Sequence, residues 1–226
     1  PMMRALILAA ATLTAFPIEA AYAQRAQAQT QQFGVDVERI VSPGGIEAWL
    51  VSDSTVPIVI MRASWRGGSA IEPANMIGVT GVMTDMLTEG AGALDANAFK
   101  ERLEELNMSL GFGAGWDGLS MSVTTLSENT DAAFEMARLA LHEPRFDAAP
   151  LERIKRQMLV GIRNRETNPG YLANEALDNA LYPNHVYARR TSRETVAAIN
   201  VEGMRERQRA LFNRATMQIT IVGDID

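Results

Sequence analysis

Hydrophobic and polar residues alternate in four segments, and this two-residue period is typical of β-strands with one buried face. The segments are 46–53, 56–65, 108–126 and 217–224. Only a short polar break separates the first two segments, so we expect them to form paired strands. The third contains the dipeptide Asp117-Gly118, which is a strong signal for a β-hairpin turn.

Apolar residues recur at helical spacing in the stretches between these strands. The expected helices cover 78–91, 95–106, 127–144, 147–166, 170–182 and 200–212. Asp95 is a suitable N-cap for the second of them, and a stripe from Leu151 to Ile162 gives the fourth a buried face. The order of elements, ββ-αα-ββ-αααα-β, predicts an α+β fold with an antiparallel-rich sheet and helices packed on one side.

Composition limits the possible partners. The chain has 226 residues, of which 47% are hydrophobic, and a formal net charge of −6. This length allows one large domain or two small ones. The one run of basic residues, Arg205, Arg207 and Arg209, alternates with Glu206 and predicts a solvated helix face. We therefore expect no nucleic-acid partner, because no cluster of basic residues could follow a phosphate backbone.

The N-terminus predicts export. Arg4, a short apolar run and an Ala-x-Ala ending at Ala23 are typical of a secretory signal peptide, although a buried N-terminal helix is the alternative. The expected organisation is a signal peptide at 1–23, a flexible tether at 24–34 and one domain at 35–226. No segment is long and apolar enough to span a membrane. The absence of cysteine is compatible with a periplasmic protein that relies on its core for stability.

The segment "GVTGVMTDMLTEGA", Gly78 to Ala91, has an unusual polar face. Gly81, Thr84, Asp85 and Thr88 lie at positions i, i+3, i+4 and i+7, so they share one side of the predicted helix. On such a face, two histidines four residues apart can bind one zinc ion, and a neighbouring glutamate can act as general base. This helix has the spacing for such a site but none of those residues.

With these residues in view, the chain resembles the insulinase and pitrilysin-type metallopeptidases, whose zinc helix carries H-x-x-E-H. The positions that match the family's helix are Gly78, Met86 and Gly90. Gly81 stands where the family has its first histidine, Thr84 where it has the catalytic glutamate, and Asp85 where it has the second histidine. The resemblance therefore implies the family's fold without its catalytic residues.

Three further segments extend the resemblance over roughly 34–226. In "VGIRNRETNP", Val160 and Gly161 stand where acidic residues would be, and Gly161 takes the place of the third zinc ligand. "LYPNHVYARR" is similar to the family's H-P-Y-G-R segment, with His185, Tyr187 and Arg189 in register. "MQITIVGDID" is similar to the strand that closes the family's first domain. The resemblance implies that the second tandem domain is absent.

These substitutions argue against metal chemistry in this chain. Asp85, with Thr84 and Thr88 beside it, could ligate a hard cation, but one carboxylate with hydroxyls is a poor cage. His142 suits the C-terminus of a helix, and His185 lies in a predicted loop. A hydrolase with an unrelated site would need a nucleophile and a base, and no convincing pair is present. We expect no cofactor here, and zinc only in a partner chain.

Two functional hypotheses remain. In the first, the chain is a catalytically inactive subunit that pairs with a zinc-bearing sister chain carrying H-x-x-E-H, and together they degrade or process peptides. In the second, it is a stand-alone periplasmic peptide-binding or assembly module. For both, the Gly-rich strand that contains Phe112, Ala114 and Trp116 is the candidate site for an extended peptide, although core packing also explains these aromatic residues.

Overall fold

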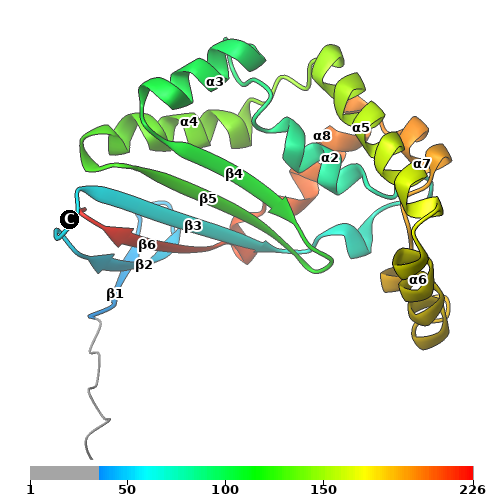
Figure 1. Cartoon of the computed structure of the whole chain (residues 1–226). Helices are drawn as coiled ribbons and strands as arrows, with labels where there is room; N and C mark the ends of the chain where they lie inside the picture. The colour runs from blue at the N-terminus through cyan, green and yellow to red at the C-terminus, as the bar shows by residue number, and fades with distance from the viewer. Residues whose placement is uncertain (1–35, 226) are drawn as a thin grey trace, which may run out of the picture. The chain divides into compact units, whose positions relative to one another are not determined.

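The computed structural model describes residues 36–225, and the predicted signal peptide and tether lie outside these residues. Six strands form one sheet (Figure 1). They are β1 (Glu38–Val41), β2 (Glu47–Ser52), β3 (Ile58–Arg66), β4 (Ser109–Ala114), β5 (Gly118–Leu126) and β6 (Gln218–Gly223). Their order is β1-β2-β6-β3-β5-β4, and every neighbouring pair is antiparallel except β2 with β6.

The pairing predicted for the first two segments is wrong, because β6 lies between β2 and β3. The backbone of Asp53 donates to Gly223 at 2.8 Å, and that of Asp224 donates to Ile58 at 3.0 Å, so β6 is bonded on both sides. Alternation identifies a strand but does not specify its partner, and here the partner comes from the far end of the chain. The sequence pattern also missed β1, whose four residues are all exposed and carry no periodic signal.

Apolar residues at helical spacing located the helices more reliably than alternation located the strand partners. The helices are α2 (Val79–Met86), α3 (Ala96–Glu105), α4 (Thr130–His142), α5 (Ala148–Glu166), α6 (Pro169–Leu181), α7 (Arg193–Ala198) and α8 (Val201–Leu211). Asp95 caps α3 as predicted, since its carboxylate accepts from the backbone N–H groups of Asn97 and Ala98. The short α7 was not predicted, although Ser192 and Thr195 form a capping box at its start.

The predicted α+β class is confirmed. Residues of β3 and β5 alternate between buried and exposed, so one face of the sheet packs and the other meets solvent. Figure 1 shows α3 and α4 along the packed face, with α2 and α8 beyond them toward the far end of β3. The core lies in this layer and includes the fully buried Met83, Phe99, Leu119 and Met204.

One residue that was predicted to lie on the surface is buried. Arg207 was expected on a solvated face, yet only 9% of it is exposed. Its Nη1 and Nη2 groups donate to the carbonyls of Ile71 and Gly68 at 3.1 and 3.4 Å. Desolvation lowers the pKa of Arg207 from its ordinary value. Among the helices that the structure describes, none is both long enough and apolar enough to cross a membrane.

Candidate functional site

Helix α2 is held at its N-terminus by a buried carboxylate. Gly78 occupies the N-cap position with φ of 99°, a conformation that glycine adopts readily. The two carboxylate oxygens of Glu72, which is 5% exposed, accept from the backbone N–H groups of Gly78 and Thr80, both at 2.7 Å. These charge-assisted bonds satisfy N–H groups that a helix start leaves unpaired, and they fix the direction of α2.

The face of α2 that resembles the zinc helix borders a cavity of about 600 Å³. Gly81 and Asp85 line this cavity, and a Cβ atom at Gly81 would meet nothing within 4 Å. Thr84 is 3% exposed, and its hydroxyl donates to the carbonyl of Gly81 at 2.8 Å. A side chain at position 81 would therefore point into open space, whereas Thr84 is turned back toward its own helix.

The other walls come from segments far apart in the sequence. The last residue of β4, Ala114, and Trp116 in the following turn contribute to one wall, and α5 contributes Met158 and Arg165. Helix α6 and the loop after it complete the wall with Tyr171, Asp178, Tyr182, Tyr187, Arg189, Arg190 and Thr191. The fold thus brings together the face of α2, the peptide-binding strand predicted from sequence, and the segment similar to H-P-Y-G-R.

Aromatic side chains cluster at one side of the cavity. The ring centroid of Tyr187 lies 5.4 Å from Trp116, 4.7 Å from His185 and 6.0 Å from Tyr182. The hydroxyl of Tyr187 donates to the carboxylate of Asp117 in the β4–β5 turn. This hydrogen bond, with some desolvation, raises the pKa of Tyr187. The hydrogen bond and the ring contacts connect the loop after α6 to the tip of the hairpin.

Sequence analysis did not identify the arginines of this site beyond Arg189. Arg190 pairs with Asp178 of α6, and Arg189 donates to the carbonyl of Glu72 at 3.3 Å. Arg165 donates from Nε to the carbonyl of Gly161 at 3.3 Å, and its guanidinium lies 5.4 Å from the centre of the Tyr171 ring. The one sequence feature that could have pointed to Arg165 was Gly161, the glycine inside α5 that lies one turn before it.

The predicted site residues do not all reach the cavity. Asp85, Gly81, Ala114 and Trp116 line it. Phe112 is half-buried and packs against the core, which is the alternative considered for it. Gly161 does not line the cavity either, although a Cβ atom built there would lie 3.8 Å from Nη2 of Arg165, which does.

The residues present do not fit a catalytic zinc ion. Positions 81 and 161 carry no side chain, and the hydroxyl of Thr84 is bonded to its own helix. Asp85 is left as the one carboxylate on this face, and partial burial, together with the nearby Glu89, raises its pKa. Within residues 36–225, no group of three or more His, Cys, Asp or Glu side chains could hold a metal ion. A zinc site needs three protein ligands and an open position.

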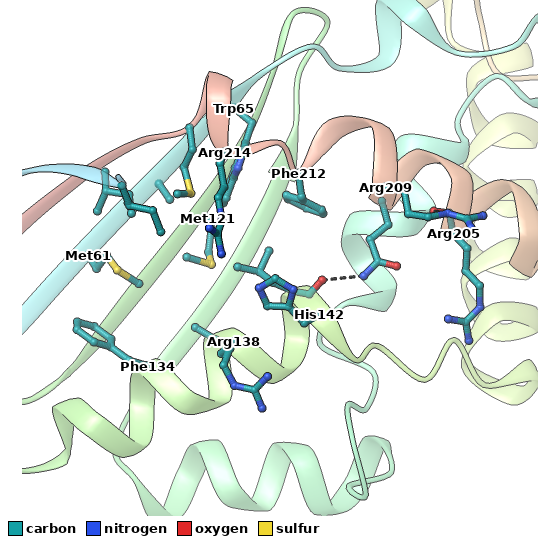
Figure 2. A pocket seen from close by; sticks show the side chains of 17 residues that line it. Met61, Trp65, Met121, Phe134, Arg138, His142, Arg205, Arg209, Phe212 and Arg214 are labelled. Atoms are coloured by element: carbon teal, nitrogen blue, oxygen red, sulfur yellow. Dashed lines mark hydrogen bonds between the residues drawn. The ribbon is translucent and has the colours of Figure 1, made fainter. Parts of the chain in front are cut away.

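A second cavity, of about 650 Å³, lies elsewhere in the domain and is mainly apolar (Figure 2). Its floor is formed by Met61 and Trp65 of β3 and Met121 of β5, and its sides by α4 and α8. His142 lies here, at the end of α4 as predicted, and the two cavities share no lining residue. None of the positions that resemble the family's catalytic residues borders this cavity.

Comparison with known proteins agrees with this geometry. The peptidase M16 inactive domain from Pseudomonas fluorescens matches 84% of this chain and 47% of its own, with a TM-score of 0.76 and 28% sequence identity. The Helicobacter pylori protein named non-peptidase homolog YmxG is 25% identical over 172 residues, which are 75% of this chain and 40% of that protein. The resemblance to the insulinase and pitrilysin-type peptidases is confirmed. No family model matches the chain.

The fold of this peptidase-like domain recurs at lower identity. The first half of the periplasmic protease PqqL from Escherichia coli has a TM-score of 0.72 and 16% identity, over 84% of this chain and 43% of that one. The chain therefore spans less than half the length of each of these proteins. The described residues correspond to one unit of a longer architecture in these relatives.

Proposed function

We propose that this chain is a catalytically inactive, peptide-holding subunit that pairs with a zinc-bearing sister chain carrying H-x-x-E-H. The observation that carries the proposal is the face of α2. It opens into a cavity large enough for several side chains, yet it presents Gly81 and Asp85 where a peptidase needs its metal ligands. In this proposal, substrate still reaches the cavity, but the residues that would activate water are missing. Zinc is expected only in the partner.

The proposed mode of peptide binding uses the sheet. Strand β4 is the last in the sheet order, so its outer edge has no neighbouring strand in the described part of the chain. An extended peptide could add to such an edge through backbone hydrogen bonds alone. The strand leads directly to Ala114 and Trp116, which line the cavity and would contact the peptide's side chains.

The relatives support both parts of the proposal. Two of them bear names that describe an inactive domain or a non-peptidase homolog, and each is at least twice as long as the segment matched here. The proposal therefore includes a second unit, which lies either in the same polypeptide or in a partner chain. We also propose a periplasmic location, which rests on the predicted signal peptide and on the similarity in fold to the periplasmic protease PqqL.

A pull-down from the native host tests the pairing. The tagged full-length protein is captured after mild crosslinking, and co-purifying chains are identified by mass spectrometry. Recovery of a stoichiometric chain containing H-x-x-E-H is the expected result. As a control, the same capture uses Trp49→Ala, a substitution on the exposed sheet face away from the cavity. Capture of the chain alone would contradict the subunit proposal.

The alternative is a stand-alone peptide-binding module. One observation favours it: several segments of this one domain together line a cavity of about 600 Å³. In that case, peptides would co-purify with the protein and no sister peptidase would be recovered.

A further inference from the structure

The cavity beside α2 contains an arginine whose hydrogen-bonding capacity is largely unused. Arg165 donates from Nε to the carbonyl of Gly161, and no other hydrogen bond of the Arg165 side chain to a described residue is present. A guanidinium group has five N–H donors, so the two Nη groups keep four of them available. Arg165 lines this cavity and also a neighbouring cavity of about 360 Å³.

The carboxylates that line the same cavity form no ion pair with Arg165. Both oxygens of Glu72 accept backbone N–H groups of α2, and Asp178 pairs with Arg190. Asp85 makes no ion pair with Arg165 within the described residues, and Glu166, next in sequence, pairs with Arg193 instead. Arg189 also lines the cavity with no carboxylate partner in the described part of the chain. Three arginines and three acidic residues line the cavity, and among these Arg165, Arg189 and Asp85 form no ion pair with a described residue.

The position of Arg165 is fixed by two contacts. Its guanidinium stacks 5.4 Å from the ring centre of Tyr171, which restrains the plane of the group, and the bond to the Gly161 carbonyl restrains its stem. A guanidinium that is already held in place loses less freedom when it binds a ligand. With Nε engaged, the two Nη groups form a fork that matches the two oxygens of a carboxylate.

The absence of a long side chain at position 161 suits the same arrangement. A glycine in the middle of a helix costs about 1 kcal/mol relative to alanine. The Cβ atom of an alanine would lie 3.8 Å from Nη2 of Arg165, and a longer side chain would extend into the guanidinium itself. An acidic residue at position 161 would form an ion pair with Arg165 and neutralise its charge. The missing side chain at 161 therefore leaves Arg165 free.

We propose that Arg165 is a carboxylate-binding residue of this cavity, so that the domain selects peptides that bring a carboxylate to it, from an acidic side chain or from the C-terminus. This inference rests on the proposed function, since it names the chemistry of the peptide that the cavity holds. Arg165 determines specificity in this proposal and takes no part in bond cleavage.

Calorimetric titration of the purified chain with four matched peptides tests the proposal. All share an eight-residue sequence of Val, Thr and Ala with an acetylated N-terminus. One is amidated and uncharged, one has a free C-terminal carboxylate, one is amidated with a single internal Glu, and one is amidated with a Gln at that position. We expect at least one carboxylate peptide to bind about 10-fold more tightly than its uncharged match. The peptide that gains affinity identifies the source of the carboxylate.

Three variants assign the effect to Arg165. Arg165→Gln should remove the preference and leave the affinity for the uncharged peptide unchanged. Arg165→Lys should keep part of the preference, because lysine retains the charge without the fork. The control Arg163→Gln removes the same charge from an exposed position of α5 outside the cavity and should have no effect. Equal binding of charged and uncharged peptides, or equal loss with Arg163→Gln, would overturn the proposal.

A small probe separates this proposal from the peptide-holding function. N-acetylglutamate is titrated while the Nε–H resonances of the arginines are followed by NMR. A shift of the Arg165 resonance without binding of any peptide would retain the carboxylate site and contradict the peptide-holding function. Peptide binding without preference for a carboxylate, and without a shift of Arg165, would retain that function and overturn the carboxylate site. No shift and no peptide binding would overturn both.

Discussion

The two cavities of this domain differ little in volume, about 600 and 650 Å³, but greatly in how their side chains are used. The apolar cavity is floored by core residues, of which Trp65 is 4% and Met61 9% exposed. Its Arg138 pairs with Glu135 and Glu143, and its Arg209 with Glu202. Its Arg205 and Arg214 form no ion pair with the described residues. The polar cavity is bounded by half-exposed rings, by Arg190, which pairs with Asp178, and by Arg165 and Arg189, which have no carboxylate partner in the described chain. Volume therefore does not identify the functional site.

We expect this difference to separate residues that stabilise the fold from residues that bind ligands. Side chains of the apolar cavity contribute to the core, so we expect their loss to reduce the free energy of unfolding. Apart from Glu72, whose two oxygens hold the start of α2, the side chains of the polar cavity contribute less to the core, so we expect their loss to affect ligands more than folding. The predictions that follow test this division.

The largest expected effect is that of Trp65→Ala. The ring of Trp65 meets that of Phe212 edge-on, with centroids 4.9 Å apart, in the apolar cavity. Removal of such a buried aromatic side chain should lower the free energy of unfolding by about 3–5 kcal/mol. Trp116→Ala is the matched change in the polar cavity, where the side chain is 39% exposed, and should cost less than about 1.5 kcal/mol. Urea titration of both variants measures the difference; equal losses would contradict the division.

Glu72→Gln should have the next largest effect. The amide keeps one acceptor oxygen, so one of the two backbone N–H groups of Gly78 and Thr80 would face an N–H group instead. A buried donor left unpaired costs about 1–3 kcal/mol, and this is the loss of unfolding free energy that we expect. Glu101→Gln, on the exposed surface of α3, is the control and should leave stability unchanged. A neutral result for Glu72→Gln would show that α2 does not depend on this cap.

The two glycines at the degenerate ligand positions should tolerate alanine. A Cβ atom at Gly81 meets nothing within 4 Å, and at Gly161 it makes an ordinary contact with Arg165. Each replacement should raise the free energy of unfolding by about 0.5–1 kcal/mol, because alanine favours the helix. Gly90→Ala is the control and should destabilise, since Gly90 has φ of 112°. Destabilisation by Gly81→Ala would mean that packing requires this glycine.

Asp85→Asn should give the smallest effect, visible as a change in pH dependence. Partial desolvation and the neighbouring Glu89, which pairs with Arg153, raise the pKa of Asp85 in the folded state. The folded protein therefore gains stability from protonated Asp85 at low pH and loses this gain as the pH rises through the folded pKa, starting at about pH 4. The variant should lack this loss. Melting temperatures between pH 3 and pH 8 compare them, and parallel curves would contradict the prediction.

Sequence patterns predicted the elements of this fold better than their arrangement. Alternation located β3, β5 and β6, and Asp95 located the start of α3, because these signals are local. Insertion of β6 between β2 and β3 depends on residues about 165 positions apart, which no local pattern encodes. The exposed β1 and the six-residue α7 have too few buried residues to show a period.

The residues of the candidate site also divide into those that sequence patterns predicted and those that they did not. Gly81, Asp85 and Trp116 were predicted from motif and strand patterns and line one cavity. Arg165 was not predicted, because an arginine near the end of an amphipathic helix is ordinarily solvated. Its role depends on Tyr171 and Gly161, one from the next helix and one a turn away, and these meet it only in the folded chain.

Zinc binding by the purified chain tests the central claim most directly. The chain is equilibrated with excess zinc, passed through a desalting column and analysed for metal by mass spectrometry, beside the variant with Gly81→His, Asp85→His and Gly161→Glu. Our account predicts less than about 0.1 zinc per wild-type chain, because a zinc site needs three protein ligands and α2 offers one carboxylate. The variant restores the ligand types and should retain more zinc than the wild type. One zinc per wild-type chain, lost on Asp85→Asn, would contradict the account.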